Sequence, residues 1–157
     1  MSSSVSLRIA AACFFSMLAP IGVRAQAPAP IAVIINRNNP ETGLAVEDLR
    51  HLYLGVRTAF PNRAPVLLLA LPRISKRFYS TALQMSPDEV KRYWIGLVFS
   101  GDSAVPPKEI ADVAELKRLV ARHTGAVGFI PAGDADSTIR VVDIEGKRPD
   151  DPGYALR

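Results

Sequence analysis

The sequence predicts an α/β domain with a single small sheet, mixed or parallel, flanked by helices. Short apolar runs, IAVII at 31–35 and VLLLAL at 66–71, are typical of strands buried on both faces of a sheet. Longer segments between and after them carry apolar residues at helical spacing. The resulting order β-α-β-α-α-α-β-β is typical of an α/β domain.

Residues 1–27 are expected to be a secretory signal peptide that is cleaved. Arg8 supplies the positive charge, an apolar stretch follows, and Ala25 and Ala27 provide the small residues of a cleavage site. The apolar stretch is shorter than the ~20 residues that a membrane span needs. We therefore expect a periplasmic or secreted protein with no membrane insertion after cleavage. Because Cys13 is the single cysteine, the mature chain would have no disulfide.

The first two helices are expected on either side of the second strand. Val46, Leu49 and Leu52 recur at helical spacing, and Gly55 follows the end of that segment. After the second strand, the sequence predicts a helix from about residue 75 to residue 85.

The third helix has a clear start. Ser86 is expected at the N-cap with Pro87 at the first helical position, and Glu89 completes a capping box. The buried face of this helix is expected to contain Val90, Tyr93, Trp94, Leu97 and Val98.

The rest of the domain is a fourth helix and two strands. The helix DVAELKRLVARH is ended by Gly125, and strands are expected in AVGFIPA and STIRVVDI. The domain would therefore span residues 28–145. Residues 146–157 are polar with two prolines and are expected to form a loose tail.

Charge and composition exclude several classes of function. The formal net charge is +4, and the signal contains Arg8 and Arg24, so the mature chain is close to neutral. Nucleic-acid binding would need a dense basic face. His51 and His123 lie in different helices without further ligands, so no metal site is expected. No nucleophile motif or Gly-rich phosphate loop is present, and we expect neither an enzyme nor a cofactor.

The candidate binding site lies in LPRISKRF, residues 71–78. Ser75 is expected at the N-cap of the second helix, with Lys76 and Arg77 in its first turn and Arg73 within reach. Cations in a first turn are disfavoured by about 0.3–1 kcal/mol each. A bound oxyanion would reverse this, because it would meet free N–H groups and the cations together. The alternative is a plain helix cap with solvated charges.

Four segments resemble a known family. NNPETGLAVEDLRHLYLG, YWIGLVFSG, the PP that follows it, and TGAVGFIPA occur in the order found in phosphate-type periplasmic binding proteins, over residues 31–142. The chain thus resembles the small, single-domain phosphate ABC transporter substrate-binding-like proteins. The resemblance implies one lobe of the type 2 periplasmic binding fold.

The resemblance also implies a function. It implies a periplasmic protein that recognises an inorganic oxyanion and is linked to phosphate transport or sensing. Phosphate is the favoured candidate for that oxyanion. In that family the loop matching LPRISKRF contains a Ser-Gly-Thr anion cradle. Here Ser75 matches the serine, and Lys76 and Arg77 occupy the next two places.

Two other hypotheses stay open at this point. The domain could be an interaction module that contacts an envelope transporter or sensor and binds no small molecule. It could also bind another small ligand through Tyr93 or Trp94, if either ring is exposed.

Overall fold

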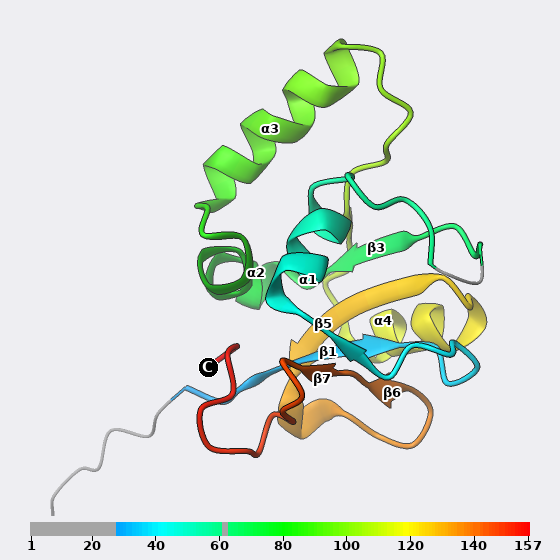
Figure 1. Ribbon diagram of the computed structural model, residues 1–157, viewed down its shortest axis with the longest axis vertical. Coiled ribbons are helices and arrows are strands. Elements are labelled where there is room, and N and C mark those ends of the chain that lie inside the picture. Colours follow the sequence, from blue (N-terminus) through cyan, green and yellow to red (C-terminus); the bar gives the residue numbers. More distant parts are fainter. Residues whose placement is uncertain (1–27, 61–62) are drawn as a thin grey trace, which may run out of the picture.

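The computed structural model describes residues 28–60 and 63–157. The expected signal peptide, residues 1–27, lies outside the described residues. Five strands form one mixed sheet in the order β4-β3-β5-β1-β6. β3 is parallel to β4 and β5, whereas β1 is antiparallel to β5 and β6 (Figure 1). The strands of this sheet are β1 (Ile31–Ile35), β3 (Leu67–Ala70), β4 (Lys108–Glu109), β5 (Ala126–Pro131) and β6 (Arg140–Val141).

The predicted α/β class with a mixed sheet flanked by helices is confirmed, with one addition. A second, two-stranded parallel sheet pairs β2 (Gly43–Leu44) with β7 (Asp143–Ile144). The predicted strand STIRVVDI is therefore two short strands that belong to different sheets. β4 was not among the predicted strands.

Helices cover both faces of the main sheet. They are α1 (Val46–Tyr53), α2 (Pro72–Phe78), α3 (Pro87–Phe99) and α4 (Val113–Arg122), with a π-helix η1 (Tyr79–Leu83) and a 3₁₀ turn η2 (Ala132–Asp134). Neighbouring residues of a strand point to opposite faces, and β5 shows this directly. The Phe129 ring stacks on Phe78 of α2 at a centroid distance of 3.9 Å. The neighbouring residue of the strand, Gly128, faces α4 instead, because a Cβ added at Gly128 would lie 2.8 Å from Leu116 of that helix.

The turn after β1 fixes the end of α4. Asn36 is buried, and its Nδ2 donates to the carbonyls of Val120 and Ala121 at 2.9 and 2.8 Å. Asn39 is also buried and donates to the carbonyl of Thr124. These amides satisfy carbonyls that a helix end leaves without an intrahelical partner.

The prediction of a loose C-terminal tail was wrong. Tyr154 and Leu156 are buried in the same core as the sheet. The Ile31 N–H donates to the Leu156 carbonyl, and the Tyr154 hydroxyl donates to the Ile31 carbonyl, both at 2.8 Å. Two apolar side chains in a polar segment are enough to hold it over the first residue of β1.

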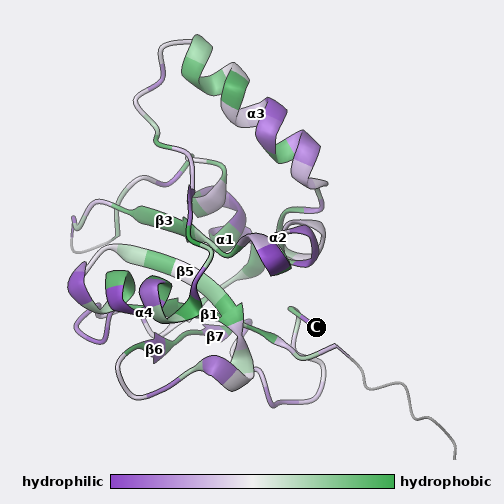
Figure 2. Cartoon of the chain, turned by 180° about the vertical axis from the view of Figure 1, so that it is seen from behind, coloured by the Kyte–Doolittle hydropathy of each residue, from purple (hydrophilic) through white to green (hydrophobic). Residues whose placement is uncertain are grey.

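α3 starts as predicted but is less buried than predicted. The Ser86 N–H donates to the Glu89 carboxylate at 2.7 Å, and Ser86 Oγ accepts from the Glu89 N–H, which forms the expected capping box. Trp94 is 5% exposed, but Val98 is 53% exposed rather than buried. The helix extends away from the sheet, and residues 100–107 lead the chain back to it (Figure 1). Its apolar C-terminal half is coloured as strongly hydrophobic as parts of the sheet (Figure 2).

Candidate functional site

The start of α2 differs from the prediction. The helix begins at Pro72, because proline suits the first helical position, and its N-cap is Leu71, without a side-chain cap. Ser75 lies inside the helix and its Oγ donates to the Leu71 carbonyl at 2.9 Å. Lys76 and Arg77 lie in the last turn, where cations are favourable. The predicted Ser75 cap and the predicted cations in the first turn were therefore wrong.

The N-terminus of α2 offers few donors to an anion. Pro72 has no N–H, and the Ile74 N–H donates to the Leu71 carbonyl at 3.1 Å. The backbone cradle expected from the sequence is thus largely occupied or absent. Any anion site here must depend on side chains.

Three predicted residues do come together, on the side of the helix. Arg73, Lys76 and Arg77 are spaced i, i+3 and i+4, so they share one face, which we call the cationic face of α2. With Ile74 and Ser80 they line a shallow pocket of about 430 Å³, and none of the described residues in its lining carries a carboxylate. Like charges at this spacing disfavour one another. A bound anion would relieve that repulsion.

The cations of this face have few partners. Arg73 forms an ion pair with Asp134 at 2.9 Å, but both side chains are about half exposed, and such pairs contribute little. Arg77 Nη2 donates to the Ala29 carbonyl, and its Nε has no hydrogen-bond partner in the described part of the chain. Within that same part, the side-chain ammonium of Lys76 forms no hydrogen bond or ion pair. Two of the three charges are therefore not neutralised by a described carboxylate.

The charged side chains at the edge of the sheet next to this face already have partners of opposite charge or backbone N–H groups. Ligands of α/β sheets bind outside the carboxyl ends of strands, which here include β3 and β5. Lys117 pairs with Asp136 at 2.6 Å, and its hydrogen bond holds the pKa of the Asp136 carboxyl well below its usual range. Asp112 caps α4 by accepting from two backbone N–H groups. The shallow pocket at this edge is lined by three carboxylates against two cations, Arg73 and Lys117, so it suits an anion poorly.

A larger groove lies on the other side of Lys76. We call it the α3 groove; its volume is about 720 Å³. Its lining comprises Pro72, Ser75, Lys76, Tyr79, Pro87, Asp88, Val90, Lys91, Trp94, Ile95, Val98, Phe99, Pro106, Pro107 and Glu109. Ser75 therefore faces this groove and not the pocket of the cationic face. The groove was not predicted, although the run WIGLVF, apolar on every side of a helix, was a signal for it.

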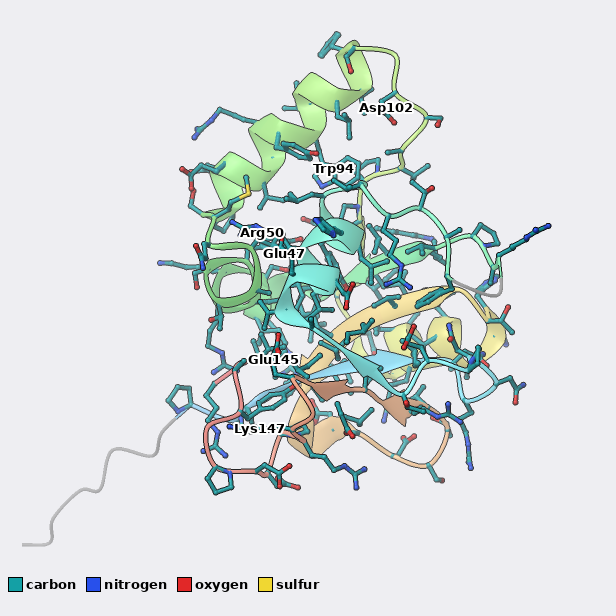
Figure 3. All side chains as sticks on the ribbon, viewed as in Figure 1. Glu47, Arg50, Trp94, Asp102, Glu145 and Lys147 are labelled. Carbon is teal, nitrogen blue, oxygen red and sulfur yellow. The ribbon has the colours of Figure 1, made fainter. Side chains whose placement is uncertain are left out.

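The two aromatic residues proposed as ligand contacts are mostly buried. The six-membered ring of Trp94 packs near Gly55, where a Cβ would lie 2.8 Å from Trp94 Cη2, and the side chain lies between α3 and the body (Figure 3). The Tyr93 hydroxyl donates to the Leu54 carbonyl at 2.8 Å. The condition set for that hypothesis, an exposed ring, is thus not met by Trp94.

The histidines have local partners. His51 Nε2 lies 3.3 Å from Glu47 Oε1 on the same helix, a pair that the sequence prediction overlooked. His123 follows α4 as its C-cap. Among residues 28–60 and 63–157, no group of three or more His, Cys, Asp or Glu could hold a metal ion. In the same residues, no helix has the length and apolar character needed to span a membrane.

Solved structures of phosphate-type binding proteins match this fold. A putative phosphate ABC transporter substrate-binding protein with bound phosphate from Clostridium perfringens matches with a TM-score of 0.63 and 19% identity, covering 77% of this chain and 47% of that chain. PstS from Borrelia burgdorferi matches with a TM-score of 0.62 and 11% identity, covering 82% and 54%. An ABC-type phosphate transport receptor from Vibrio cholerae matches with a TM-score of 0.53 and 21% identity, covering 77% of this chain and 48% of that chain.

These matches establish the fold. The predicted resemblance to part of a phosphate-type binding protein is confirmed at the level of architecture, and the chain spans about half the length of the structures it matches. No protein-family model and no curated protein matches the chain. The matched proteins are described as a transport receptor and a substrate-binding protein, not as enzymes.

Proposed function

We propose that this protein is a substrate-binding-like protein of the cell envelope that binds an inorganic oxyanion on the cationic face of α2. Phosphate is the favoured candidate. One observation carries the proposal: Arg73, Lys76 and Arg77 share one helix face and have a single opposing carboxylate, Asp134, among the described residues. The descriptions of the matched structures, which name phosphate, support the choice of ligand.

The chemistry of the three side chains suits a tetrahedral oxyanion. Arginine presents a planar fork of donors that can contact two oxygens, and lysine adds a point charge. α2 is held in place by Phe78, which is fully buried, so the cations project from a fixed helix. The pocket is shallow and exposed, so water screens the charges. We therefore expect weak affinity, on the order of millimolar.

Anion-dependent stability tests the proposal. A ligand that binds only the folded chain raises its melting temperature. We expect phosphate and sulfate, but not chloride at equal ionic strength, to stabilise residues 28–157. Lys76→Gln and Arg77→Gln should each remove most of the shift, whereas Arg118→Gln, a charge-matched change on α4, should keep it. Equal effects of all three salts, or equal loss in Arg118→Gln, would contradict the proposal.

The cellular location and partners are part of the same proposal. A cleaved signal at residues 1–27 would place the protein outside the cytoplasm, where an envelope transporter or sensor would be its partner. An interaction module without a small ligand would gain no stability from any oxyanion. The salt comparison therefore decides between the two hypotheses as well.

A further inference from the structure

Lys76 joins two surfaces that differ in chemistry. It lines the pocket of the cationic face together with Arg73 and Arg77, and it also lines the α3 groove. The cationic face supplies unneutralised positive charge. Because Lys76 belongs to the lining of both, one molecule could contact both surfaces.

The α3 groove has the size and lining of a small-molecule site. Its volume of about 720 Å³ lies within the range of ligand pockets, and such pockets are mostly apolar and aromatic. Ile95, Val98 and Phe99 line it while remaining 46%, 53% and 87% exposed. Burial of exposed apolar side chains against a ligand is favourable. The groove can therefore contribute affinity that the shallow cationic pocket lacks.

Two further features belong to residues of the groove lining. Trp94 lines the groove, is almost fully buried, and its indole N–H has no hydrogen-bond partner in the described segments. Tyr79, which also lines the groove, starts the π-helix η1, and π-helical turns occur frequently at functional sites. Neither observation depends on the charges of the cationic face.

The charges within the groove indicate which part of a ligand fits there. Lys76 and Lys91 are accompanied by Asp88 and Glu109. These four charges balance, so the groove itself does not attract an anion. An uncharged apolar body suits the groove, and a negative head suits the cationic face.

We propose that the ligand is an organic oxyanion, in which a phosphate-type head is attached to an apolar body. The head binds Arg73, Lys76 and Arg77, and the body lies in the α3 groove against the exposed side chains of Ile95 and Val98. This inference rests on the proposed function for the head and adds the class of molecule that carries it.

Calorimetry with three compounds tests the inference. Hexyl phosphate has both parts, inorganic phosphate has only the head, and 1-hexanol has only the body. We expect hexyl phosphate to bind about tenfold or more tightly than inorganic phosphate, because its methylene groups leave water. Trp94 is the single tryptophan, so its emission should change in a saturable way with hexyl phosphate but not with inorganic phosphate.

Two matched variants locate the body of the ligand. Val98→Asp places a charge in the groove and should lower the affinity for hexyl phosphate to that for inorganic phosphate. Val105→Asp, at another exposed valine outside the groove lining, should leave the difference intact. Circular dichroism of both variants checks that each one folds.

The outcomes separate this inference from the proposed function. Equal affinities for hexyl phosphate and inorganic phosphate would overturn the inference and leave the oxyanion site standing. Binding of 1-hexanol as tight as that of hexyl phosphate would also overturn it, because the head would then contribute nothing. No binding of inorganic phosphate or hexyl phosphate would overturn both.

Discussion

The two walls of the α3 groove are held to the molecule in different ways. On one side, α2 and η1 are fixed by Phe78, which is fully buried and stacks on Phe129 of the sheet. On the other side, α3 is attached mainly through Val90 and Trp94, while most of the apolar residues of its C-terminal half remain exposed.

This difference separates two tasks within one short stretch of chain. The buried wall can present charges in a fixed arrangement, which is what recognition of a small anion requires. The exposed wall has few buried contacts, and such regions open at low free-energy cost. It can therefore adjust to an apolar body of variable shape.

The largest expected effect is at the buried wall. Phe129→Ala should lower the free energy of unfolding by about 3–5 kcal/mol, because it leaves a cavity beneath Phe78 and Tyr53. Urea denaturation followed by far-UV circular dichroism measures this. A loss below about 1 kcal/mol would mean that α2 is not anchored as described.

A smaller effect is expected where α3 meets the body. Gly55 has a φ of +72°, and a Cβ there would lie 2.8 Å from Trp94 Cη2. Gly55→Ala should therefore cost about 1–2 kcal/mol for its backbone conformation, plus the cost of displacing the indole. Gly101→Ala, with a φ of +80° and no atom of the described residues within 4 Å of the added Cβ, should cost only the backbone part.

The emission of Trp94 distinguishes the two glycine variants. It should shift to longer wavelength in Gly55→Ala and stay unchanged in Gly101→Ala. Identical stability and emission in both variants would show that the contact between Gly55 and Trp94 does not hold α3.

The smallest effect is expected at the exposed wall. Phe99 is 87% exposed, so Phe99→Ser should change the free energy of unfolding by no more than about 0.5 kcal/mol. The same denaturation experiment measures this. A loss comparable to that of Phe129→Ala would mean that α3 packs against something in the free protein and that its wall is not exposed.

Local signals in the sequence predicted much of the fold. The buried runs at β1 and β5 and the Ser86 capping box appear where expected, since each depends on residues close together in the chain. The burial of Tyr154 could not be seen, because it depends on a hydrogen bond to Ile31, 123 residues away.

The candidate site was predicted in composition but not in geometry. Arg73, Lys76 and Arg77 were recognised as a group, but Ser75 was placed at the helix start because a serine is a common cap. The helix starts instead at Pro72. The ion pair between Arg73 and Asp134 joins residues that are distant in the chain, so no local sequence pattern predicts it.

Mapping phosphate by NMR tests the central claim most directly. Inorganic phosphate titrated into ¹⁵N-labelled protein, with chloride as the control, reports the position of the anion on each backbone amide. We expect saturable shifts confined to residues 73–80 and their absence in Lys76→Gln. Shifts centred on residues 112–117 and 133–136 at the sheet edge, or no saturable shift at all, would contradict an oxyanion site on the cationic face of α2.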